Sequence, residues 1–161
     1  MKRKYESAVA AAVDFLTYKE RTEAEVREKL AEYGFAQNQI DDAVLELHES
    51  LLLDDEEYAH DFVYSKLAQK PTSIKALRMK LRRHKLDENL IEETLCELPA
   101  SSDYENAYEE ARVFLLNNIP RADDMKKLRE KLLRRLISHG YSFDDAKSAI
   151  NAAECDINEQ D

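Results

Sequence analysis

The chain has 161 residues, of which 43% are apolar and 36% are charged, and its formal net charge is −10. It contains only two glycines and three prolines, too few for sheets joined by tight hairpins, so the composition excludes a sheet-rich fold and favours helices. No apolar run approaches the length of a membrane span, and the MKRK start is followed by no cleavable apolar segment. We therefore expect a cytoplasmic protein.

The first part of the chain predicts three helices. Small apolar residues form a stripe in 8–16, and Thr22 with Glu25 has the spacing of a capping box that opens a second helix over 22–33. A third helix is expected over 38–52, after Gly34. Glycine suits the left-handed conformation in which many helices stop.

Two further groups of three helices are expected. In the second group, helix starts are predicted at three residues that favour the N-cap position: Asp54 before 56–68, Ser73 within 71–84, and Asp87 before 88–98. In the third group, the first helix is expected to start at Ser102 with Glu105 and to be followed by a linker over 117–124. A second helix is expected over 126–139, and a last helix is opened by Ser142 with Asp145.

The three groups repeat one pattern. A shift of 51 residues pairs Thr22 with Ser73 and Leu30 with Leu81, and KLAEYGF at 29–35 returns as RLISHGY at 135–141. Such periods are typical of units that bury their apolar faces against their neighbours. We expect an all-α fold of three tandem three-helix repeats stacked into an elongated, curved helical array. Its expected parts are repeat 1 at 1–53, repeat 2 at 54–99, repeat 3 at 100–155, and a disordered acidic tail at 156–161.

No arrangement of residues indicates catalysis or metal binding. The histidines lack the i,i+4 pairing of a metal site and are expected at the surface or its boundary, and Cys96 and Cys155 lie too far apart for ligand spacing. The acids at 54–57 are better explained as a helix start than as a magnesium site. We expect no enzyme, no cofactor and no metal. The histidines are His48, His60, His84 and His139.

Charges are segregated along the chain. The segments 37–62 and 86–111 each carry nine acids and no lysine or arginine, whereas 63–85 carries eight basic residues and no acid. A second basic block, 126–135, has six basic residues against Glu130. A protein that is acidic overall can therefore present a positive face locally. The alternative is that the basic helices only pair with acidic neighbours.

Helical periodicity identifies the side chains that would form such a face. At 100° per residue, Ile74, Leu77 and Leu81 share the buried side of the second middle helix, and Leu128, Leu132 and Leu136 share that of the third. The candidate partner- or DNA-binding residues lie on the opposite side or its flanks: Lys75, Arg78, Met79, Arg82, Arg83 and Lys85, then Lys126, Lys127, Lys131, Arg134 and Arg135.

Two stretches resemble the RecX family of bacterial recombinase regulators. They are ERTEAEVREKLAEYGF at 20–35 and LLLDDEEYAHDFVYSK at 51–66, the second placed between repeats 1 and 2 as in that family. With the three tandem units, the resemblance covers nearly the whole chain. The chain departs from the family pattern at three positions where the family has glycine: Leu51, Pro71 and Lys85. Lys85 corresponds to Gly34, so its turn must be built differently or at some strain.

The resemblance implies a binding protein that needs no chemistry of its own. RecX proteins attach to the RecA recombinase and restrain its filaments on single-stranded DNA, so the expected function is to limit filament growth, ATP hydrolysis and strand exchange. This would place the protein in RecA regulation, homologous recombination, DNA repair and the SOS response. The expected partner is the RecA filament, with single-stranded DNA within or beside it, and we expect a monomer that contacts no membrane.

A second hypothesis is a helical nucleic-acid-binding module that acts by itself. Three-helix units with a basic second or third helix also occur in helix-turn-helix proteins. The acidic total charge, and the lack of a helix rich in both arginine and asparagine, favour the recombinase regulator. Binding to DNA without RecA at moderate salt distinguishes the two.

Overall fold

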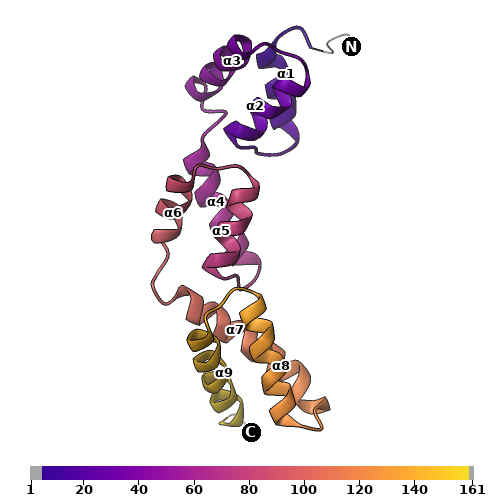
Figure 1. The fold of residues 1–161 in the computed structure, drawn as a ribbon, viewed down its shortest axis with the longest axis vertical. Helices are drawn as coiled ribbons and strands as arrows, with labels where there is room; N and C mark the ends of the chain where they lie inside the picture. The colour runs from indigo at the N-terminus through magenta and orange to yellow at the C-terminus, as the bar shows by residue number, and fades with distance from the viewer. Residues whose placement is uncertain (1–4, 160–161) are drawn as a thin grey trace. The chain divides into compact units, whose positions relative to one another are not determined.

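The computed structural model describes residues 5–159, and the regular structure in that range is helical throughout (Figure 1). It comprises nine α-helices and one short 3-10 helix among the residues described. The prediction of an all-α protein is confirmed. The proposed repeat boundaries at residues 53 and 99 remain a prediction, although the helices follow one another in three groups of three along the chain.

The first group consists of α1 (Ala8–Tyr18), α2 (Glu23–Glu32) and α3 (Gln37–Glu49). The predicted capping box is confirmed, because the Thr22 hydroxyl accepts from the Glu25 amide at 3.4 Å and the Glu25 carboxylate accepts from the Thr22 amide at 3.2 Å. Helix α3 ends three residues earlier than expected. The chain leaves the helix there because Leu51 adopts a left-handed conformation with φ +55°.

The second group consists of α4 (Asp55–Gln69), α5 (Ile74–Arg83) and α6 (Glu88–Cys96). Its helix starts agree with the sequence analysis. Each predicted cap accepts a hydrogen bond from a backbone amide two or three residues further on, as N-cap side chains do. The bonds run from Glu57 to Asp54 at 3.1 Å, from Ala76 to Ser73 at 3.1 Å, and from Asn89 to Asp87 at 2.9 Å.

The third group consists of α7 (Ser102–Asn118), η1 (Ile119–Arg121), α8 (Met125–Ser138) and α9 (Phe143–Asn158). The expected cap at Ser102 is wrong by one residue. Ser102 is buried inside the helix, and the N-cap is Ser101, whose hydroxyl donates to the Glu105 carboxylate at 2.7 Å. The expected linker is shorter than predicted, because α7 and η1 occupy most of it.

The expected disordered tail also needs correction. Helix α9 continues to Asn158, the Tyr108 hydroxyl donates to the Asp156 carboxylate, and Ile157 packs against the core of this part of the chain. Residues 156–158 are therefore ordered by packing that the acidic composition does not reveal. Residues 160 and 161 lie outside the described part of the chain.

The chain divides into two compact units. The first comprises the residues up to Phe62 together with Lys80–Thr94, and the second comprises Val63–Met79 together with the residues from Leu95 onward. The first has a core from α1, α2 and α3 that includes the fully buried Val26, Leu30 and Leu47. In the second, α7, α8 and α9 bury Leu115, Leu132, Leu136 and Ile150.

The helix stops after α2, α5 and α8 share one backbone conformation. Gly34 and Gly140 have φ values of +81° and +102°, and Lys85 has φ +58°. Lys85 therefore builds the same turn as the two glycines, at a cost of about 1 to 2 kcal/mol for a residue with a Cβ. Of the two alternatives expected for the turn at Lys85, the strained backbone is therefore the one that the structure contains.

Gly140 and Gly34 share a left-handed backbone conformation, but only Gly140 is closely surrounded by other residues. A Cβ added to Gly140 would lie 2.6 Å from the Ser73 hydroxyl and 3.2 Å from the Lys75 Cβ, whereas a Cβ on Gly34 would meet nothing within 4 Å. Gly140 is therefore required both for its positive φ and for the close approach of α5 to the end of α8.

We predict that Gly34→Ala lowers the free energy of unfolding by about 1 kcal/mol, because only the left-handed conformation is penalised. Gly140→Ala should lower it by about 2 kcal/mol or more, since Ser73 must also move. Urea unfolding of both variants measures the difference. Equal losses would show that the approach of Ser73 to Gly140 contributes nothing.

Candidate partner-binding surfaces and the contacts that position them

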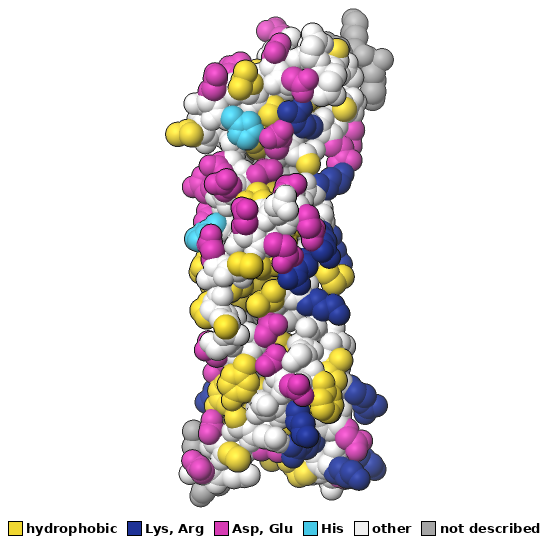
Figure 2. Space-filling view, turned by 60° about the vertical axis from the view of Figure 1, so that its left-hand side comes forward, with side chains coloured by type: hydrophobic (Ala, Val, Ile, Leu, Met, Phe, Trp, Pro, Cys, Tyr) yellow, Lys and Arg dark blue, Asp and Glu magenta, His cyan; other side chains and the backbone are white. Residues whose placement is uncertain are grey.

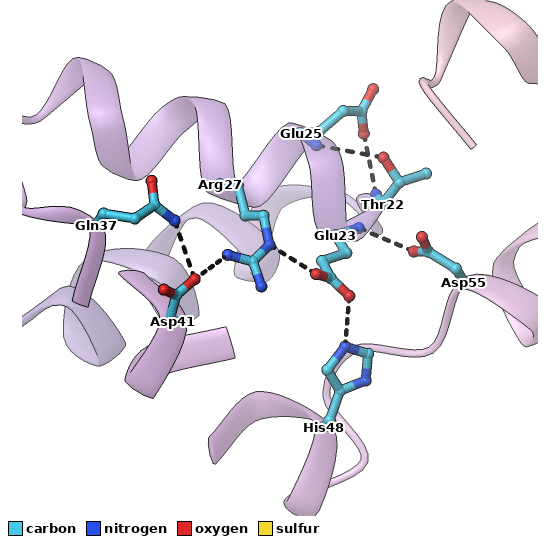
Figure 3. A network of polar contacts seen from close by, with 8 residues as sticks. All are labelled: Thr22, Glu23, Glu25, Arg27, Gln37, Asp41, His48 and Asp55. Carbon is cyan, nitrogen blue, oxygen red and sulfur yellow. Dashed lines mark hydrogen bonds and ion pairs between the residues drawn. The ribbon is translucent and has the colours of Figure 1, made fainter. Parts of the chain in front are cut away.

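The helices that carry the candidate basic residues, α5 and α8, are held at their ends by side chains from neighbouring groups of helices. In the first unit, the Thr22 hydroxyl, which caps α2, donates to the carbonyl of His84 at the end of α5, at 2.7 Å. The first amide of α2, that of Glu23, donates to the Asp55 carboxylate at 2.8 Å (Figure 3). We call this pair of contacts the first junction.

The second unit contains the same pair of contacts, the second junction. The Ser73 hydroxyl, which caps α5, donates to the carbonyl of His139 at the end of α8, at 2.7 Å. The first amide of α5, that of Ile74, donates to the Asp103 carboxylate at 2.7 Å. Backbone groups at helix ends have no partner inside the helix, so each junction satisfies one amide and one carbonyl of this kind.

Two electrostatic effects oppose each other at both junctions. Each carboxylate lies at the positive N-terminal end of a helix, where the macrodipole stabilises negative charge. Burial nevertheless raises the pKa of Asp103 above its ordinary value, although the bond from the Ile74 amide opposes the shift. Burial likewise raises the pKa of Asp55 against the bond from the Glu23 amide.

The histidines at the junctions contact acids as well as backbone. His84 Nδ1 lies 2.9 Å from Glu25 Oε1, and its ring packs against Tyr58 and Phe62 with centroid distances of 5.5 and 5.1 Å. His139 Nδ1 lies 2.6 Å from Glu110 Oε1. These contacts explain both histidines structurally, His84 as a partly buried residue and His139 as an exposed one. Among residues 5–159, no group of three or more His, Cys, Asp or Glu could hold a metal ion.

A polar network extends from the first junction across α2 and α3 (Figure 3). Glu23 lies between Arg27 Nε at 2.6 Å and His48 Nε2 at 2.8 Å, and Arg27 also contacts Asp41 at 2.6 Å. Burial opposes the ionised form of Glu23, but the bonds from Arg27 and His48 lower its pKa overall. The network therefore compensates the charges of Glu23, Arg27 and Asp41 within the first unit.

The candidate residues on α8 are largely uncompensated. Lys126 and Lys131 are exposed without an acidic partner among the described residues, and Arg134 donates only to the Glu130 carbonyl of its own helix at 3.3 Å. Lys127 is 3.8 Å from Asp124, but its side chain is 83% exposed. Arg135 differs, because its Nε donates to Glu110 at 2.9 Å.

The candidates in 75–79 lie near the second junction. Lys75 is exposed without an acidic partner in the described part of the chain, and Met79 is 50% exposed. Arg78 is half-buried, and its charge acts against the rise in the pKa of Asp103. The prediction that Lys75 and Met79 face away from the core is confirmed, with Arg78 at the flank.

The candidates in 82–85 belong to the first unit, and two of them are already paired. Arg82 Nε donates to Glu88 at 3.0 Å, and the Lys85 ammonium contacts Glu28. Arg83 is exposed with no acidic partner within residues 5–159. Pairing with acidic neighbours therefore applies to only part of the set, and a role for the others in binding stays a prediction. Pairing accounts for Arg82, Lys85 and Arg135, and leaves Lys75, Arg83, Lys126, Lys131 and Arg134 uncompensated.

Figure 2 shows Asp, Glu, Lys and Arg side chains exposed on the surface in view. The described helices include none that is both long and apolar enough to cross a membrane.

Family models match two segments of the chain. Residues 8–47 match the first three-helix domain of RecX, and residues 54–95 match the second three-helix domain of RecX. The crystal structure of RecX from Lactobacillus salivarius superposes with a TM-score of 0.80 at 22% identity, covering 92% of this chain and 95% of that one. Because the sequences are only 22% identical, this match is evidence for the fold alone.

Curated relatives carry the name regulatory protein RecX. The relative from Clostridium botulinum (strain Eklund 17B / Type B) is 34% identical over 147 residues, which cover 89% of this chain and 66% of the relative. That from Prosthecochloris aestuarii is 27% identical over 89% of this chain and 91% of the relative. The chain spans 56% of the Streptococcus pneumoniae (strain Hungary19A-6) relative.

The buried junction carboxylate predicts an unusual pH dependence. Because the folded-state pKa of Asp103 is raised, its contribution to stability is present below the ordinary value of 3.8 and is lost as the pH rises through the folded-state value. Asp103→Asn keeps an oxygen acceptor for the Ile74 amide and does not titrate. The stability of the wild type minus that of the variant should therefore fall as the pH rises from about 3 to 7.

Asp41→Asn is the control of opposite sign. Bonds from Arg27 and Gln37 lower the pKa of Asp41, so its contribution is present above the ordinary value and lost as the pH falls. For this variant, the same difference should rise with pH. Urea unfolding at a series of pH values measures both. The interpretation of Asp103 is contradicted if the stability difference for Asp103→Asn rises with pH, as is expected for Asp41→Asn.

Proposed function

This chain belongs to the RecX family, and we propose that it is a regulator that binds RecA and its filaments on single-stranded DNA. In this proposal it restrains filament growth, ATP hydrolysis and strand exchange, and acts as a cytoplasmic monomer without catalysing a reaction. Family membership supports the regulatory role, since its relatives are named regulatory proteins. RecA is proposed as the partner because the sequence resemblance implies it.

The observation that carries the proposal is the set of uncompensated cations on helices whose other side is buried. In α8, Leu132 and Leu136 are fully buried, while Lys131 and Arg134 lie exposed without an acidic partner among the described side chains. Unpaired cations of this kind suit a negatively charged partner, because binding does not first require an internal ion pair to break.

The net charge of −10 influences which negative partner is favoured. Long-range repulsion weakens a site that contacts only phosphate, because DNA carries a dense line of negative charge. We therefore propose that acidic groups of RecA supply most of the contact and that DNA phosphates of the filament supply the rest. Such a protein limits the filament by occupying it.

We predict that the protein slows the DNA-dependent ATP hydrolysis of RecA at less than one copy per RecA subunit. A filament that is capped or interrupted at one place loses many subunits, so few copies should suffice. The steady-state hydrolysis rate, measured over a range of ratios, tests this. Inhibition only at equimolar ratio would indicate competition for DNA, and no inhibition at any ratio would contradict the proposed function.

Charge reversal tests the proposed surface in the same assay. Lys131→Glu with Arg134→Glu should raise the concentration needed for half-inhibition at least tenfold while leaving the melting temperature nearly unchanged. Lys19→Glu with Lys147→Glu is the control, because both lysines are exposed, lie outside the proposed surface, and give the same change in net charge. Equal effects of the two pairs would mean that only the net charge matters.

The same variants test the alternative of a stand-alone nucleic-acid-binding module. Tight binding to single-stranded DNA without RecA at moderate salt would favour it. Log affinity should then fall by about 0.7 per neutralised phosphate for each unit of log salt, so loss of two contacts would flatten that slope by about 1.4. Contact with RecA acids gives gentler screening and requires no DNA.

A further inference from the structure

A pocket in the first unit is lined by residues that the proposed function does not use. It lies among the end of α1, the segment between α3 and α4, and the first turns of α4, and has a volume of about 210 Å³. Its apolar lining comes from Leu16, Leu51, Leu52 and Tyr58, and its polar lining from Glu20, Arg21, Asp54, Glu57 and Asp61.

Leu51, which lines the pocket, is unfavourable in two ways: its backbone is strained and its side chain is exposed. Its backbone is left-handed at φ +55°, a conformation that disfavours residues with a Cβ, and its side chain is 84% exposed to water. The neighbouring Leu52 is 53% exposed. Strain and adjacent exposed leucines are both unfavourable for the isolated chain, and a docked partner would relieve the exposure.

The charges around the pocket are negative and only partly compensated. Glu20 and Glu57 are exposed and have no cationic partner within the described range 5–159, and Asp61 contacts only His60, at 3.8 Å. Arg21 also lines the pocket, with its guanidinium carbon 4.7 Å from the centre of the Phe15 ring. An incoming cation is therefore favoured at the acids and disfavoured beside Arg21.

We propose that this pocket docks a segment of a partner protein in which an aliphatic or aromatic side chain lies between lysines or arginines. The apolar side chain contacts Leu51 and Leu52, and the flanking cations meet Glu20, Glu57 and Asp61. Burial of the leucines supplies affinity, and the acids select the partner's charge. The contact is separate from the basic surface and does not depend on RecA being the partner.

The charge of the pocket argues against two other kinds of occupant. Nucleic acid and anionic lipid surfaces both carry dense negative charge, and Glu20, Glu57 and Asp61 repel them. A purely apolar segment would leave these acids without partners. A basic segment with an apolar centre satisfies both the leucines and the acids.

A short peptide of the stated chemistry tests the proposal. Acetyl-Lys-Lys-Leu-Leu-Lys-Lys-amide, titrated into the full chain labelled with ¹⁵N, should shift the amide resonances of Leu51, Leu52 and Tyr58 in a saturable way. The peptide with Gly-Gly in place of Leu-Leu and the peptide with Glu in place of Lys should each bind at least fivefold more weakly. Equal binding of the Gly-Gly peptide would overturn the proposal, because attraction to the net charge would then explain it.

Substitutions locate the site independently. Leu51→Gly should raise the melting temperature, since glycine relieves the left-handed strain, yet weaken peptide binding at least threefold. Leu51→Gly with Leu52→Ser should weaken it at least tenfold. Leu45→Ser is the control, because Leu45 is a 59% exposed leucine of the same unit outside the pocket. Loss of affinity in the control as large as in the double variant, shifts centred elsewhere, or no binding up to millimolar peptide would each overturn the proposal.

Discussion

The capping of α2 and of α5 by the group of helices that follows each of them is the interaction on which both units depend. The first amides of α2 and α5 donate to Asp55 and Asp103, and the cap hydroxyls of Thr22 and Ser73 donate to backbone carbonyls. Thr22 and Ser73 are both fully buried. Buried backbone groups at a helix end cost about 1 to 3 kcal/mol each when they have no partner. The junctions avoid this cost by giving these groups hydrogen-bond partners.

The junctions also determine which residues remain available for partners. Close approach at the second junction requires Gly140, and it holds the ends of α5 and α8 together within that unit. With their apolar sides buried and their ends capped, these helices leave only their outer sides exposed. Lys131 and Arg134 on α8 are therefore held on a rigid helix, which lowers the entropy lost when they bind a negative partner.

Local sequence signals predicted the helices and their apolar sides well. The capping box at Thr22, the cap at Asp87 and the burial of Leu81 each depend on residues within one turn or on the helical period, and all three are confirmed. The early end of α3 could be suspected from the missing glycine at Leu51, but a left-handed leucine is uncommon enough that periodicity alone favoured a longer helix.

The rest depended on contacts between distant parts of the chain. Asp103 and Ile74 are 29 residues apart, and nothing local indicates that this carboxylate caps another helix. Similarly, the sequence identified Arg135 and Arg134 as equivalent candidates, whereas the structure pairs Arg135 with Glu110 and leaves Arg134 with only a carbonyl of its own helix. Ion-pair partners are set by tertiary geometry, which charge patterns along a sequence do not contain.

Native-state hydrogen exchange of the first helical amides tests the junctions most directly. First amides of helices usually exchange rapidly because the helix offers them no acceptor. The amides of Glu23 and Ile74, bound to carboxylates at 2.8 and 2.7 Å, should exchange at least tenfold more slowly, relative to their intrinsic rates, than those of Gln37 and Phe143, which open α3 and α9. Exchange of all four amides at similar relative rates would contradict the account.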